Sequence, residues 1–118
     1  MRVDEDTRFR MMRLIEADPN ISQRRIAREL GISVGAVNYC LNALIEKGLV
    51  KIENFRASSR KLSYIYMLTP KGVSEKAGLT RGFLLRKMAE YEALKAEIEE
   101  IREHVEDMDD VPGHTNVQ

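Results

Sequence analysis

The segment LGISVGAVNYCL, residues 30–41, has the spacing of a helix but carries no charged side chain. If Ser33 begins that helix, the outward face presents hydroxyl, amide, small and aromatic groups. An asparagine can form two hydrogen bonds with an adenine edge, and a valine can contact a thymine methyl group. A glycine lets the helix backbone come close to a duplex. The residues predicted to read bases in a major groove are Ser33, Val34, Gly35, Asn38, Tyr39 and Asn42.

Basic side chains lie on both sides of this segment in the sequence. Three arginines precede it at residues 24–28, and basic residues with two serines follow it at residues 56–61. Such side chains contact backbone phosphates, which positions a protein on DNA without reading its sequence. A flexible basic tip can also reach an adjacent minor groove. The predicted backbone contacts are Arg24, Arg25, Arg28, Arg56, Ser58, Ser59, Arg60 and Lys61.

Each of these residues also has a simpler interpretation. Asn38 and Asn42 suit a solvated helix surface, and Gly35 can be tolerated in a first turn. Tyr39 can pack against the hairpin that follows, and charges at a hairpin tip discourage unwanted strand pairing. Which interpretation applies depends on the secondary structure predicted around the segment.

Three helices are predicted in the first part of the chain. The first covers residues 4–17 and ends before Pro19, because the residue before a proline disfavours the helical region. The second covers residues 23–30 and the third residues 33–47, with an aspartate or serine at each start as N-cap. Their apolar residues recur at helical spacing, which predicts three amphipathic helices around one core.

The second and third helices match the spacing of a helix-turn-helix. This motif needs a small residue where the two backbones approach and a permissive residue in the turn. Ala27 and Gly31 occupy these positions, four residues apart. The inward apolar positions then fall on Ile26, Leu30, Ile32 and Val37.

After the third helix the pattern changes to that of strands. Residues 49–55 and 62–68 are rich in Val, Ile, Tyr and Phe, and they are predicted as two strands joined by a polar tip at residues 56–61. Thr69 and Pro70 begin a last helix, predicted to reach about Asp107. This helix is either continuous or broken near a glycine at position 78.

This order of elements is that of a winged helix-turn-helix followed by a dimerisation helix. The predicted fold class is therefore mainly α, an α+β winged helix-turn-helix, with a long C-terminal dimerisation helix. The predicted domains are a DNA-binding domain at 1–69, a coiled-coil helix at 70–108 and a disordered tail at 109–118.

The formal net charge of zero hides two oppositely charged parts. Residues 1–88 hold 17 Lys and Arg against 9 Asp and Glu, whereas residues 89–118 hold 2 against 10. A basic domain of this size is a candidate for binding a polyanion. Chance and an ordinary charged helix explain the same asymmetry equally well, so charge by itself does not decide the partner.

Apolar residues between Tyr91 and Met108 recur at alternating steps of three and four, which is heptad spacing. In a parallel pair, two glutamates at g then face a lysine and an arginine at e of the partner. We therefore predict a parallel homodimer, with a trimer and a helix folded back on its own head as alternatives. Two heads related by a twofold axis predict an inverted repeat in double-stranded DNA. The predicted interface residues are Leu84, Tyr91, Leu94, Ile98, Ile101 and Val105.

Several other classes of protein find no support in the sequence. The single Cys40 is expected in the core, and no Cys or His pattern predicts a metal site. No nucleophile–base pair, phosphate loop or paired carboxylates predict an enzyme, and no cofactor is predicted. No stretch approaches the roughly 20 apolar residues of a membrane span, and the N-terminus lacks a secretory pattern, so a cytoplasmic location is expected.

From about residue 6 to residue 105, the sequence resembles the EPS-associated subgroup of MarR-family transcriptional regulators. The most specific pieces are GAVNYCLNALIEKG, NFR and YMLTPKG. The resemblance implies a bacterial DNA-binding regulator whose genes tend to lie with exopolysaccharide biosynthesis clusters. It places the recognition helix at 33–47 and the wing at 54–61.

The sequence departs from typical MarR proteins at its start. Those proteins carry a helix before the DNA-binding core, and a small-molecule pocket lies where that helix and the dimer domain meet the core. Here the dimer is expected to rest on the last helix alone, and a small-molecule inducer is doubtful.

Two other functions compete with DNA-binding regulation. A protein-interaction adaptor could use the winged helix for docking, but it would not need the 8 Lys and Arg against 3 Asp and Glu of residues 19–61. The second alternative is binding of RNA, or of DNA without sequence preference. Such binding would depend steeply on salt concentration but would favour no particular sequence.

Overall fold

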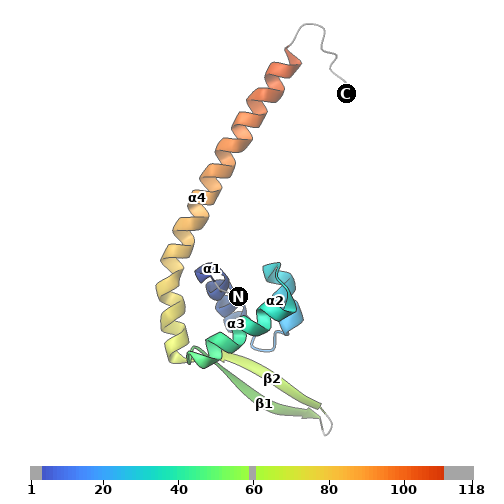
Figure 1. The fold of residues 1–118 in the computed structure, drawn as a ribbon, viewed down its shortest axis with the longest axis vertical. Coiled ribbons are helices and arrows are strands. Elements are labelled where there is room, and N and C mark those ends of the chain that lie inside the picture. Colours follow the sequence, from blue (N-terminus) through green and yellow to red (C-terminus); the bar gives the residue numbers. More distant parts are fainter. Residues whose placement is uncertain (1–3, 59–60, 111–118) are drawn as a thin grey trace. The chain divides into compact units, whose positions relative to one another are not determined.

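The computed structural model describes residues 4–58 and 61–110, and for residues 55–58 and 61–63 it describes only the backbone. It confirms a mainly helical winged helix-turn-helix with a two-stranded wing and a long last helix (Figure 1). The elements are α1 (Glu5–Ala17), α2 (Gln23–Leu30), α3 (Val34–Glu46), β1 (Val50–Ser58), β2 (Lys61–Leu68) and α4 (Pro70–Asp109).

Local side-chain caps define where the first three helices begin. The Asp4 side chain accepts a hydrogen bond from the Thr7 amide at 2.7 Å, so Asp4 is the N-cap of α1. Ser22 and Ser33 cap α2 and α3 in the same way, with oxygen–nitrogen distances of 3.1 and 3.0 Å. Gly31 ends α2 with φ of 67°, a left-handed conformation that residues with a Cβ rarely adopt.

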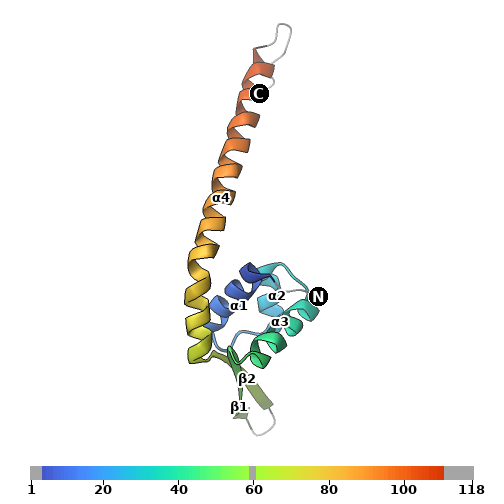
Figure 2. The same ribbon diagram turned by 60° about the vertical axis from the view of Figure 1, so that its left-hand side comes forward.

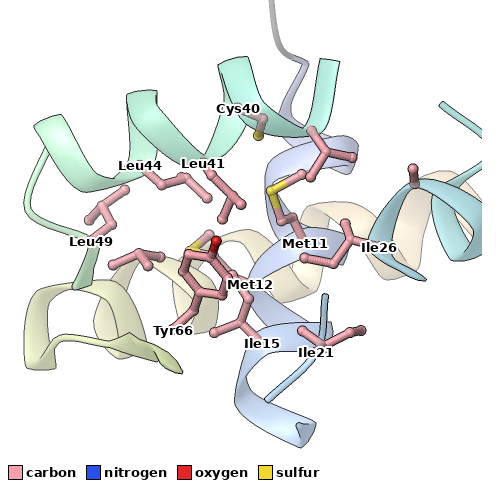
Figure 3. Close-up of a cluster of buried hydrophobic side chains, with 13 residues drawn as sticks. Met11, Met12, Ile15, Ile21, Ile26, Cys40, Leu41, Leu44, Leu49 and Tyr66 are labelled. Atoms are coloured by element: carbon pink, nitrogen blue, oxygen red, sulfur yellow. The ribbon is translucent and has the colours of Figure 1, made fainter. Parts of the chain in front are cut away.

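One apolar core joins α1, α2, α3 and the start of the wing (Figure 3). The predicted inward residues Ile26, Ala27 and Val37 are buried, whereas Leu30 and Ile32 are half-buried at its edge. Cys40 is a core residue, as predicted, and burial raises the pKa of its thiol to about 11. Five further core members were not predicted from the sequence: Met11, Ile21, Leu49, Val50 and Tyr66.

The strands of the wing are longer than predicted. β1 and β2 pair antiparallel from Val50 opposite Leu68 out to Ser58 opposite Lys61, so most of the predicted tip at 56–61 is strand. The prediction stopped the strands where apolar residues ended, but backbone hydrogen bonds continue a ladder irrespective of side-chain polarity. Both ribbon views show the hairpin leaving the helices from the C-terminal end of α3 (Figures 1 and 2).

The first compact unit extends beyond the wing and includes α4 as far as Phe83. The rings of Phe9 on α1 and Phe83 on α4 have their centroids 4.5 Å apart. Lys76 adds an ion pair with Glu16 at 2.8 Å. The start of α4 is therefore packed against α1.

The beginning of α4 is also fastened to the loop between α3 and β1. Thr69 caps it by accepting from the Gly72 amide at 3.0 Å, and the same hydroxyl donates to the Gly48 carbonyl at 2.6 Å. Gly72 is buried against the backbone of Leu49, and a Cβ at this position would overlap the Leu49 carbonyl oxygen. The backbones of the loop and of the start of α4 are thus so close that no side chain fits at Gly72.

The second unit consists of residues 84–118, and its described part is the remainder of α4. α4 is continuous through Gly78, which answers the question that the sequence left open. A helix of 40 residues is about 60 Å long at about 1.5 Å per residue. In the described part of the chain, no helix combines the length and the apolar character needed to cross a membrane. The predicted disordered tail lies outside the described residues from position 111 on.

Candidate nucleic-acid interface

The outward face of α3 is open, and it carries no charged side chain before Glu46 at its C-terminal end. All six residues predicted to read bases are exposed, with 46% of Val34 and 47% of Tyr39 accessible to solvent. Val37, Cys40 and Leu41 face the core, and this fixes which side of the helix turns outward. The structure therefore brings together the side chains that the sequence analysis selected: Ser33, Val34, Gly35, Asn38, Tyr39 and Asn42.

The start of α3 can accept an anion as well as a base edge. Ser33 uses a lone pair to cap the helix, and its O–H hydrogen remains available to a phosphate oxygen. The exposed amides of the first turn and the positive end of the helix dipole favour the same partner. Ser33 is thus placed to contact a phosphate while it holds the helix start.

Gly35 has space that a side chain could fill without harm to the fold. A Cβ there would meet its nearest atom, the Ser33 Oγ, at 3.8 Å, which is an ordinary contact. Glycine therefore stands at an exposed helical position where alanine would fit and would stabilise the helix by up to about 1 kcal/mol. Packing within the chain does not require this glycine, but close approach of an external surface would.

We expect Gly35→Ala to separate folding from binding. The free energy of unfolding should stay equal or rise by up to about 1 kcal/mol, because the helix gains propensity. Affinity for a cognate duplex should fall, because the added methyl group would keep the helix backbone from approaching the DNA as closely. Urea unfolding and titration of labelled duplex measure the two quantities. Unchanged affinity would show that Gly35 is a tolerated surface glycine.

Four polar side chains link the wing to the outward face of α3. Gln23 Nε2 donates to the Tyr66 hydroxyl at 3.2 Å, and Asn38 Nδ2 donates to Gln23 Oε1 at 3.5 Å. Asn42 Nδ2 in turn donates to Asn38 Oδ1 at 3.2 Å. The sequence analysis assigned no function to Gln23 or Tyr66, although strand alternation could have placed Tyr66 toward the core.

The predicted phosphate contacts of α2 are placed as expected on its surface. Arg24, Arg25 and Arg28 are exposed, while Ile26 and Ala27 of the same helix are buried. α2 packs against α3, the helix that carries the residues predicted to read bases. The positive charge of these arginines favours an anionic partner along this side of the domain.

The wing residues are described less completely. Arg56, Ser58 and Lys61 lie in the paired strands, but their side chains are outside the described part of the structure. Ser59 and Arg60 lie outside the described residues altogether. The predicted contacts of these five residues with DNA backbone stay predictions.

The six predicted interface residues of α4 are all exposed, although all are large and apolar. Their exposed fractions run from 45% for Ile98 to 62% for Tyr91. Within the single chain, Glu90 pairs with Lys87 at 2.9 Å and Arg102 with Glu99 at 3.4 Å. Exposed pairs of this kind contribute roughly 0–1 kcal/mol, so they can exchange for pairs with a second chain.

Within the described residues, no group of three or more His, Cys, Asp or Glu side chains could hold a metal ion. Buried side chains in that part are apolar apart from the Tyr66 hydroxyl and the Cys40 thiol.

Comparison with known proteins agrees with this geometry. A family model described as winged helix-turn-helix DNA-binding matches residues 4–51, which cover α1 to the beginning of β1. A comparison with curated protein sequences finds no match.

Several solved structures share the fold. A MarR/EmrR-family transcriptional regulator from Acinetobacter sp. ADP1 is 21% identical, with a TM-score of 0.58 over 86% of this chain and 76% of that one. Wild-type ZitR of Lactococcus lactis, solved in complex with DNA, is 23% identical, with a TM-score of 0.57 over 90% and 73%. A MarR-family protein of Mycobacterium tuberculosis, solved with p-aminosalicylic acid, is 21% identical, with a TM-score of 0.54 over 80% and 76%. Identities at this level show the fold.

Proposed function

We propose that this protein is a dimeric, sequence-specific DNA-binding transcriptional regulator of the MarR family, without enzymatic activity. The observation that carries the proposal is the exposed face of α3, uncharged from Val34 to Asn42, on a helix that packs against α2 with its exposed arginines. A solvated helix surface usually carries charged side chains, whereas a major groove reads amide, small and apolar groups. The match of residues 4–51 to the winged helix-turn-helix model supports the same function.

In this proposal the two kinds of contact have separate tasks. Asn38, Asn42 and Val34 read base edges, and Tyr39 either joins them or packs toward the wing. The arginines of α2 and the basic residues of the wing contact phosphates, which sets orientation and most of the salt dependence. The acidic second half of α4 is kept away from the duplex by charge repulsion.

The proposed dimer forms through α4 as a parallel coiled coil. Its seam is the row of exposed apolar residues from Leu84 to Val105, which burial in a second copy would remove from water. Parallel pairing sets Glu90 and Glu97 against Lys95 and Arg102 of the second copy. Two heads then bind half-sites about 10 bp apart, or a multiple of that, in an inverted repeat.

The proposed target genes are those of exopolysaccharide synthesis. This part rests on the resemblance carried by GAVNYCLNALIEKG, NFR and YMLTPKG. The solved structures do not bear on it, since they share the fold at low identity.

The proposal is tested by selecting bound sites from random duplex DNA and by measuring Asn38→Ala on the selected site. Wild-type protein should enrich an inverted repeat. Asn38→Ala should weaken binding to that repeat by about 1–3 kcal/mol and relax the preference at one base position, because one amide contact is lost. An equal loss on random DNA would contradict a base-reading role for Asn38.

A matched control replaces Arg56 and Arg60 of the wing with alanine. These changes should lower affinity for every sequence and make the salt dependence shallower, since phosphate contacts release counterions. If an intact dimer enriches no site, duplex binding without preference would favour a non-specific nucleic-acid binder, and no duplex binding at all would favour the protein-interaction adaptor.

A further inference from the structure

The hydrogen-bonded chain of Asn42, Asn38, Gln23 and Tyr66 has a direction. Each amide nitrogen donates to the oxygen of the next residue, and the Tyr66 hydroxyl accepts the last bond. The chain therefore begins on the outward face of α3, crosses to the first residue of α2 and ends on β2. The bond from Asn38 to Gln23, at 3.5 Å, is the longest of the three.

Tyr66 is a fixed end for this chain. Only 8% of the residue is exposed, and its ring belongs to the core cluster, where Figure 3 shows it with its hydroxyl oxygen. The Tyr66 amide donates to the Pro19 carbonyl at 3.1 Å, which holds its backbone. Gln23 follows the α2 cap Ser22, so its backbone is also held. The outer amides are exposed, but they are connected to a rigid anchor.

An asparagine amide that is free to turn by 180° exchanges its donor and its acceptor. In Asn38, the bond to Gln23 requires Nδ2 on one side, and the bond from Asn42 requires Oδ1 on the other. Each of these bonds uses one hydrogen or one lone pair, so a second of each remains for an external partner. The chain therefore restricts where the Asn38 amide lies, while the Tyr66 hydroxyl, which can donate as well as accept, is compatible with either order of donor and acceptor.

We propose that Gln23 and Tyr66 are positioning residues that hold the Asn38 side chain in place and thereby sharpen its base specificity. The inference rests on the proposed function, in which Asn38 reads a base. An amide held beside adenine can bond its N7 acceptor and its N6 donor together. An amide that moves from that place loses one of the two bonds and discriminates adenine less well from other bases. Gln23 and Tyr66 thus act through Asn38 and affect discrimination more than affinity.

The test is Tyr66→Phe, which removes the hydroxyl and leaves the ring in the core. On duplexes that differ from the selected site by single base pairs, discrimination at one position should fall about fivefold, the effect of one neutral hydrogen bond. Affinity for random duplex and its salt dependence should not change. Gln23→Met should reduce discrimination at the same position, and Tyr66→Phe should have no further effect when combined with Asn38→Ala.

The matched control is Tyr64→Phe, which removes a solvent-exposed hydroxyl from the same strand and should leave every base preference intact. Unaltered discrimination in both Tyr66→Phe and Gln23→Met would overturn the inference and leave the proposed function standing. Effects of Tyr66→Phe and Asn38→Ala that simply add would also overturn it. Wild-type protein without any sequence preference would overturn the proposed function, and the inference with it.

Discussion

Ile98→Glu is expected to convert the protein into monomers and to lower its affinity for a two-half-site duplex by about 10²–10⁴-fold, the range that linked binding sites supply. Ile98 occupies an a position of the proposed seam, so a parallel dimer would bury two facing carboxylates there. In the single chain Ile98 is 45% exposed, and glutamate has good helix propensity. The fold of each head should therefore survive the change.

Sedimentation at micromolar concentration and titration of a duplex with one or two half-sites measure the two effects. Leu85→Glu is the matched control, because Leu85 is also exposed and apolar on α4 but lies at position b, outside the seam. It should leave the mass and the affinity of the dimer unchanged. A wild-type chain that sediments as a monomer, or an Ile98→Glu protein that stays dimeric, would contradict the coiled coil.

Gly72→Ala is expected to lower the free energy of unfolding by about 3 kcal/mol, at the upper end of the range for overpacked sites. The new methyl group would overlap the Leu49 carbonyl oxygen and lie 3.0 Å from the carbonyl carbon. That oxygen also accepts the Thr69 amide at 3.0 Å, so the Leu49 backbone cannot move without weakening the junction between the loop and α4. Because both partners are backbone, no rotation of a side chain relieves the overlap.

Gly78→Ala provides the comparison within the same helix. A Cβ at Gly78 would have no heavy atom within 4 Å, and the residue is exposed. Alanine should therefore stabilise the protein by up to about 1 kcal/mol through helix propensity. Urea or thermal unfolding followed by circular dichroism measures both variants. Equal stabilities of the two variants would show that the loop and α4 do not approach as described.

Much of the fold could be predicted because its causes are local. Ser22 and Ser33 mark helix starts, because each side chain accepts a hydrogen bond from the backbone amide three residues later. Gly31 marks the end of α2, because glycine readily adopts the left-handed conformation found there. Helical spacing separated the buried Val37 and Leu41 from the exposed residues of α3, because a period of 3.6 residues is a property of the chain itself.

The sequence by itself therefore determined the order of the elements, the turn of the helix-turn-helix and the outward face of α3. The tertiary structure decided the length of the wing, the place of Gly72 beneath Leu49 and the connection from Tyr66 through Gln23 to Asn38. The last two features join residues that are far apart in the chain: Tyr66 follows Gln23 by 43 positions. No local period or cap encodes such a contact, because it exists only after α2 and β2 have packed around one core.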